Sequence, residues 1–148
     1  MKINLLTGDM ELANSLRRYL RHVMGVEPGG IRALIFGKEP ILSREILNTD
    51  FWIAEAWNLS EPENPEGFRT LRAMAGKAKC LVIFLFTPEG FPQEGPFWCR
   101  LPCLGLKEKI RRAMESPPPT QQDYQTLIDL WPDLAYDPGK HGHHSKKA

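Results

Sequence analysis

The sequence predicts an α/β fold, a three-layer sandwich in which helices cover both faces of a central, mainly parallel sheet of about five strands. Two observations lead to this prediction. Short apolar runs alternate with segments whose apolar residues recur at helical spacing, which is the pattern of βαβ units. The run Cys80–Phe86 is apolar without alternation, as expected for a strand that is buried on both faces.

Size and composition favour one globular domain. The chain has 148 residues, of which 42% are hydrophobic and 25% charged, and its net charge is +1. This balance predicts neither a nucleic-acid partner nor a membrane partner, and no apolar run reaches the ~18–20 residues of a membrane span. The three cysteines follow no disulfide or zinc-finger spacing, so we expect a cytoplasmic protein.

The first strand and helix are predicted at the amino terminus. Residues 3–6 form a short apolar run that is followed by Thr7-Gly8-Asp9. Apolar residues recur at helical spacing over 10–23, and Asp9 is a suitable N-cap because its carboxylate can accept a backbone N–H bond. The cluster Pro28-Gly29-Gly30 should turn the chain after this helix.

Two further strands and a second strong helix follow. Residues 31–36 and 51–57 are the predicted second and third strands, with a weak, short helix over 43–47 between them. Asn64-Pro65-Glu66 has the residue types of an N-cap, a first helical position and an acidic first turn. This helix should end at Gly76, before the strand at 80–86.

The chain is less regular after Phe86. Residues 87–95 are rich in Gly and Pro and are short for a crossover helix, so two arrangements stay open. Either the fourth crossover helix is lost, or Pro96–Leu101 returns as an antiparallel edge strand. A helix over 104–114 is predicted next.

The carboxyl terminus adds an extra helix and a tail. Thr120-Gln121-Gln122-Asp123 has the form of a capping box, and it predicts a last helix over about 120–131. Residues 1–132 then form the single domain, and 133–148 a flexible, basic tail rich in His and Lys.

Known catalytic and cofactor motifs are missing from the sequence. It has no glycine-rich phosphate loop, no G-x-S-x-G and no H-E-x-x-H. Cys99 and Cys103 are one residue further apart than a redox C-x-x-C pair. We therefore predict no catalytic residue, no metal site and no cofactor.

Four segments carry a family resemblance: Lys2–Asp9 with the helix to Leu20, Asp50–Glu55, Asn64–Met74 and Leu81–Thr87. They are similar, in order, to the opening strand and helix, the third strand, the M-D-G-F segment with its helix, and the fourth strand of response-regulator receiver domains. The resemblance spans residues 2 to about 87, and extends more weakly to 115. It implies the flavodoxin-like fold of the chemotaxis regulators, a family of bacterial type, and the helix predicted over about 120–131 is an addition to that fold.

The positions that bind Mg²⁺ and accept phosphate in that family are altered here. The acidic pair of the family falls on Thr7 and Gly8, and only Asp9, one residue later, is acidic. Because Mg²⁺ requires charged oxygen ligands, this site supplies few of them. The phosphoacceptor position falls on Glu55, whose permanent carboxylate could mimic a phosphorylated state.

The remaining family positions are partly kept. Thr87 stands where the switch Ser or Thr is expected, whereas the Lys before Pro falls on Leu101, with Arg100 one residue early. The resemblance therefore implies a pseudo-receiver with a degenerate phosphoacceptor pocket.

The functional prediction is a non-catalytic, phosphorylation-independent signalling or regulatory module. Such a module would act on a protein partner, or on a second copy, through the region around the Phe97 strand and the following helix. Phe91, Phe97 and Trp98 are expected to be exposed there and to anchor the partner.

The alternative is a small enzyme or nucleotide-binding domain of the same architecture. Phe86–Phe91 followed by Phe97-Trp98-Cys99 resembles part of a TIR domain. The catalytic Glu of that family lies near this W-C, and residues 100–105 contain no acid.

Overall fold

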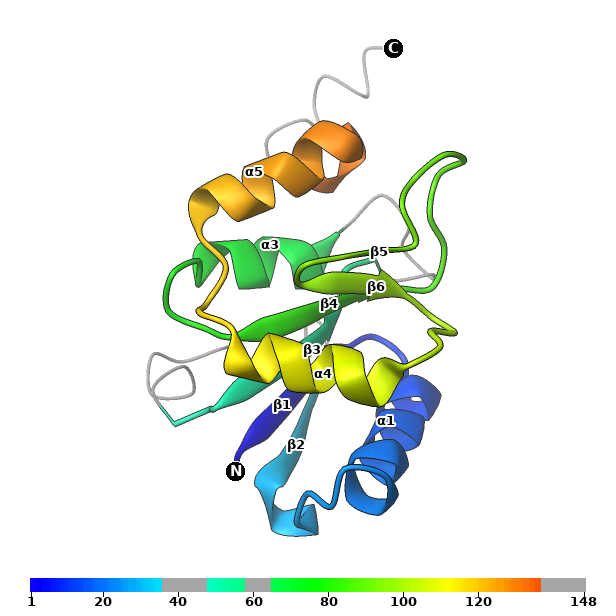
Figure 1. Cartoon of the computed structure of the whole chain (residues 1–148), viewed down its shortest axis with the longest axis vertical. Helices are drawn as coiled ribbons and strands as arrows, with labels where there is room; N and C mark the ends of the chain where they lie inside the picture. Colours follow the sequence, from blue (N-terminus) through cyan, green and yellow to red (C-terminus); the bar gives the residue numbers. More distant parts are fainter. Residues whose placement is uncertain (36–47, 58–64, 137–148) are drawn as a thin grey trace.

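The computed structural model of the chain describes residues 1–35, 48–57 and 65–136 (Figure 1). The predicted short helix at 43–47 and most of the predicted tail lie outside these residues. Within them, a six-stranded sheet has the order β2-β1-β3-β4-β6-β5. All neighbouring strands are parallel except the edge pair β5 and β6. The strands are β1 (Ile3–Thr7), β2 (Ile31–Ile35), β3 (Phe51–Glu55), β4 (Cys80–Phe84), β5 (Glu94–Gly95) and β6 (Trp98–Arg100).

The described helices lie on both faces of the sheet, as the sequence predicts. Apolar residues of α1 and α4 pack with one set of strand side chains, and those of α3 and α5 pack with the other set (Figure 1). The central strands β1, β3 and β4 are buried along their whole length, which explains their nearly continuous apolar sequences. The helices are α1 (Met10–His22), α3 (Glu66–Ala73), α4 (Leu106–Glu115) and α5 (Gln121–Leu130).

Local capping explains where the helices begin. The Asp9 carboxylate accepts hydrogen bonds from the backbone N–H groups of Glu11 and Leu12, which confirms Asp9 as the N-cap of α1. The predicted capping box of α5 is also present, with Thr120 and Asp123 as its two members. At α3 the prediction is shifted by one residue, because Pro65 is the N-cap and Glu66 the first helical residue.

The structure settles the direction of the strand near Phe97. β6 runs parallel to β4, with Val82 opposite Trp98, and no helix lies between these two strands. The fourth crossover helix is therefore lost. The two-residue strand β5 pairs antiparallel with β6 and forms the edge of the sheet.

Helix α5 covers the surface that the missing crossover helix leaves open. Its buried residues Tyr124, Leu127 and Ile128 belong to the same apolar cluster as Phe97 and Trp98. The 3₁₀ turn η2 (Pro132–Ala135) continues from α5 and adds the buried Leu134 to this cluster. Among the described residues, no helix is both long and apolar enough to cross a membrane.

Candidate functional site

The carboxyl ends of β1 and β3 bring together four of the six predicted pocket residues. β1 and β3 are adjacent parallel strands, so Thr7 at the end of one lies beside Glu55 at the end of the other. The Thr7 hydroxyl donates to Glu55 Oε1 at 2.6 Å, and the Gly8 N–H donates to the same oxygen at 3.3 Å. The Asp9 N–H in turn donates to Thr7 Oγ1 at 3.0 Å. The carboxylate is therefore held by a short chain of hydrogen bonds.

Asp9 has a structural role at this site. Its Oδ1 accepts the backbone N–H groups of Glu11 at 2.9 Å and Leu12 at 3.3 Å. These bonds satisfy donors in the first turn of α1, where a negative charge is also favoured by the helix dipole. The Asp9 carboxylate is thus engaged at the helix terminus.

Glu55 is an unusually placed acid, because its side chain is only 1% exposed. Burial raises the pKa of its carboxyl, the hydrogen bonds from Thr7 and Gly8 oppose this rise, and the nearby Asp9 carboxylate adds to it. No Lys or Arg of the described residues forms an ion pair with it. A buried acid with no cationic partner among the described residues is a candidate functional group.

Thr87 and Arg100, the other two predicted pocket residues, contact each other. Arg100 Nη1 donates to Thr87 Oγ1 at 3.5 Å, which joins the segment after β4 to the end of β6. Within the described part of the chain, no hydrogen bond or ion pair connects these two residues to Glu55. The contacts of the described residues thus join four of the six predicted residues to one another and the other two to each other.

The described residues offer little to a metal ion. No group of three or more His, Cys, Asp or Glu side chains among them is placed to hold one. At the Glu55 site the chemical capacity is that of a single buried carboxylate. It can accept hydrogen bonds and bind or release one proton.

The aromatic residues predicted as exposed partner anchors are buried. Phe91, Phe97 and Trp98 are 7%, 8% and 4% exposed, so this expectation is wrong. Phe91 and Trp98 pack at a ring-centroid distance of 5.0 Å, and Phe97 packs on Tyr124 of α5 at 5.1 Å. Because no crossover helix covers this part of the sheet, the loop aromatics themselves fill the space beneath α5.

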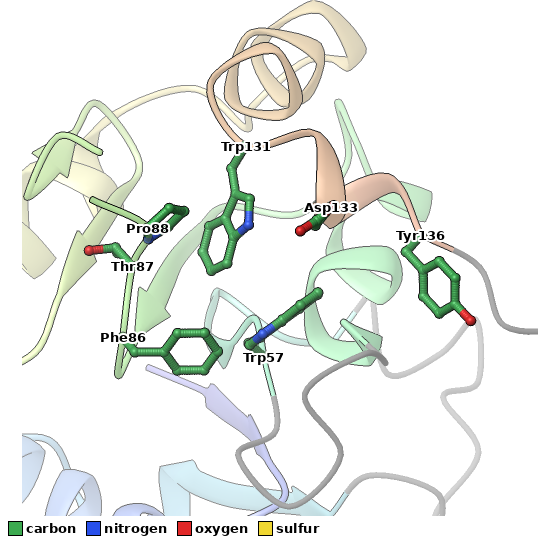
Figure 2. Close-up of a pocket in the computed structure, with 7 residues that line it drawn as sticks. All are labelled: Trp57, Phe86, Thr87, Pro88, Trp131, Asp133 and Tyr136. Atoms are coloured by element: carbon green, nitrogen blue, oxygen red, sulfur yellow. The ribbon is translucent and has the colours of Figure 1, made fainter. Parts of the chain in front are cut away.

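A hollow lies at the carboxyl ends of β3 and β4 (Figure 2). It has a volume of about 570 Å³. Of the residues that line it, Thr87 alone is predicted from the sequence as a site residue. The available signal was an aromatic residue two positions beyond each strand, Trp57 after β3 and Phe86 after β4. The lining residues are Trp57, Phe86, Thr87, Pro88, Trp131, Asp133 and Tyr136.

No family model and no curated protein sequence matches this chain.

Proposed function

We propose that the chain is a non-catalytic, receiver-like regulatory module that acts through protein contacts and does not depend on phosphorylation. The resemblance in sequence and the order of the strands support this proposal. Without the edge strand β5, the order β2-β1-β3-β4-β6 is that of a flavodoxin-like sheet. In such a sheet, ligands bind where the strand order reverses, and the end of β1 next to β3 is that place.

The observation that carries the proposal is the state of Glu55. In the resemblance it stands at the phosphoacceptor position, and in the structure it is buried and its Oε1 accepts two hydrogen bonds. The donors are Thr7 and Gly8, the residues that the resemblance aligns with the Mg²⁺-binding acids. A carboxylate that is permanently present and internally bonded has no phosphoryl state to change, so the module would work in one form.

The contact surface of this module must be formed by side chains other than the buried aromatics. Leu104, between β6 and α4, is fully exposed, and Lys107, Arg111 and Arg112 are exposed along α4. An apolar residue beside a charged helix has the composition of a small protein contact with a polar rim. We therefore place the partner surface at Leu104 and α4.

An NMR titration tests the phosphorylation-independent part. The ¹⁵N-labelled chain is titrated with Mg²⁺ and then with beryllofluoride, which mimics a phosphoryl group. We expect no saturable shift at Thr7, Gly8, Glu55 or Thr87. Saturable shifts confined to these residues would contradict the proposal and would indicate a working phosphoryl site.

Two matched variants test the contact surface. Leu104→Ser should reduce self-association or partner capture, measured by sedimentation velocity and by affinity capture with the purified chain as bait. Val23→Ser removes another exposed apolar side chain, 44% exposed at the end of α1, and should leave the association unchanged. An equal effect of both variants, or of neither, would contradict this assignment.

A further inference from the structure

The hollow between the sheet and η2 is built mainly from aromatic rings. Trp57 follows β3, Phe86 follows β4, and Trp131 ends α5. The ring of Trp131 lies 5.3 Å from that of Trp57 and 5.9 Å from that of Phe86, measured between centroids, with interplanar angles of 53° and 70°. The three rings thus pack against one another at tilted angles and together form an aromatic wall of the hollow (Figure 2).

The described lining of this hollow carries a negative charge. Among the described residues that line it, Asp133 is the one charged residue, and Figure 2 shows its carboxylate turned toward Trp131. In the described part of the chain, this carboxylate accepts no hydrogen bond and forms no ion pair. The faces of aromatic rings are also negative, so the rings and the carboxylate attract the same kind of ligand, a cation.

Size and position also fit a ligand site. A volume of about 570 Å³ lies within the range of roughly 300–1,000 Å³ that is usual for small-molecule pockets. Phe86 and Tyr136 are half-buried, so the pocket is open to solvent at these residues. It lies at the carboxyl ends of parallel strands, where ligands of open α/β sheets bind. The Thr87 hydroxyl points away from the rings (Figure 2), so the wall on that side is apolar.

We propose that this pocket binds a small free molecule with an alkylated ammonium group, such as a quaternary ammonium. The ring faces and Asp133 select a positive charge, and the apolar walls select alkyl groups around that charge. A hydrated metal cation lacks the alkyl groups, and an anion is repelled by Asp133. The inference goes beyond the proposed function and does not depend on it, because the pocket shares neither Glu55 nor α4.

The test compares two probes of equal shape and different charge. Choline and 3,3-dimethyl-1-butanol differ in having nitrogen or carbon at the branched centre. The ¹⁵N-labelled full chain is titrated with each, and the indole N–H signals of Trp57 and Trp131 are followed by NMR. We expect saturable shifts with choline, and binding of the neutral alcohol at least about fivefold weaker, since cation–π attraction is the difference.

Variants separate the charge from the fold. Asp133→Asn should weaken choline binding about threefold or more and leave the binding of the alcohol unchanged, because one full charge is lost at the rim. Asp129→Asn makes the same substitution on α5, outside the lining residues, and should not change choline binding.

Four results would overturn the inference: no saturable shift with choline, shifts that exclude both tryptophans, equal binding of the two probes, or equal effects of the two Asn variants. A trimethyl-lysine peptide that binds more than about tenfold tighter than choline would overturn the assignment to a free small molecule. Weaker or similar binding of that peptide supports it.

Discussion

At the scale of single residues, burying the Glu55 carboxylate costs free energy, and two hydrogen bonds hold the carboxylate in place. Removing a carboxylate from water is unfavourable, and the hydrogen bonds from Thr7 and Gly8 offset this only in part, because the pKa of Glu55 remains raised. The folded chain therefore binds the proton of Glu55 more tightly than the unfolded chain does. Its contribution to stability is fully present below the pKa of the unfolded chain and is lost as the pH rises through the raised pKa.

The first prediction concerns the variant Glu55→Gln. The amide oxygen of Gln can still accept from Thr7 and Gly8, and it carries no charge at any pH. We expect the free energy of unfolding of the variant to exceed that of the wild type at neutral pH, and the difference to disappear toward pH 4, near the ordinary pKa of Glu. Denaturant titrations across this pH range measure the difference.

Thr7→Val is the companion variant. It keeps the shape of the side chain and removes the donor to Glu55 Oε1, so the ionised carboxylate is left less satisfied. The variant should lose about 1–3 kcal/mol of stability, with the larger loss at neutral pH. A loss that does not change with pH, or a Glu55→Gln variant that is less stable than the wild type at every pH, would show that Glu55 does not carry a desolvation cost.

At the scale of elements, the sequence predicts the strands and helices whose signals are local. The apolar run at 80–86 and the capping residues Asp9 and Thr120 act within a few positions, and the corresponding elements are present. The direction of β6 depends on its pairing with β4, a contact between residues far apart in the sequence. The Gly- and Pro-rich residues between the two strands do not indicate whether this pairing is parallel or antiparallel. That is why the sequence left two arrangements open there.

The same limit explains the error over the loop aromatics. Phe91 and Phe97 lie among Gly and Pro, a composition typical of exposed loops. Their burial follows from the absence of a crossover helix and from the position of α5, and both are tertiary facts. Exposed aromatic rings would leave a large apolar area in water, whereas packing against Phe84 and Tyr124 removes it.

The second prediction concerns the edge hairpin. A Cβ at Gly95 would overlap the indole ring of Trp98, the residue opposite it in the β5–β6 pair. Gly95→Ala should therefore displace the ring and cost about 1–3 kcal/mol, the usual range for overpacking. Thermal unfolding and the amide signals of β5 and β6 measure the effect.

Gly29→Ala is the matched control for this prediction. Gly29 lies in the 3₁₀ turn η1 (Pro28–Gly30), and a Cβ there meets no other atom within 4 Å. The substitution should be neutral or stabilise the chain by about 0.4–1 kcal/mol, because alanine restricts the unfolded state. Equal destabilisation by both variants would indicate that the chain is sensitive to Gly→Ala changes in general, and that Trp98 is not the cause.

At the scale of the whole molecule, the contacts agree with one part of the predicted site. The resemblance predicts Thr7, Glu55, Thr87 and Arg100 in one pocket, and Thr7 and Glu55 contact each other at the carboxyl ends of adjacent parallel strands. Thr87 and Arg100 contact each other, and no contact among the described residues joins them to Glu55. For the aromatic pocket the sequence offers only Trp57 and Phe86 as signals, since Trp131 reaches it through the packing of α5 over the sheet.

Each face of the sheet contains one buried thiol, and the reactivity of the two thiols shows whether both helix layers unfold together. Cys80 lies in the apolar cluster of α3 and α5, and Cys99 in that of α1 and α4. Burial raises the pKa of each thiol to about 12, so neither reacts as a thiolate in the folded chain. Cys103 is half-buried and is therefore the accessible thiol of the three.

The third prediction follows from this arrangement. Native protein treated with iodoacetamide near pH 8 should be alkylated rapidly at Cys103, whereas Cys80 and Cys99 should react only when the chain opens. If both helix layers depend on one sheet, the two buried thiols should be alkylated at the same rate, with the same increase on addition of denaturant. Mass spectrometry of the digested protein gives the rate at each cysteine, and the unfolded chain in concentrated guanidinium chloride gives the reference rates.

Faster alkylation of Cys99 than of Cys80 would instead show that the α1 and α4 layer opens while the α3 and α5 layer stays folded. The fold would then behave as two units that share a sheet. In that case Cys99 would be exposed first because its strand, β6, has just three residues and lies near the edge of the sheet.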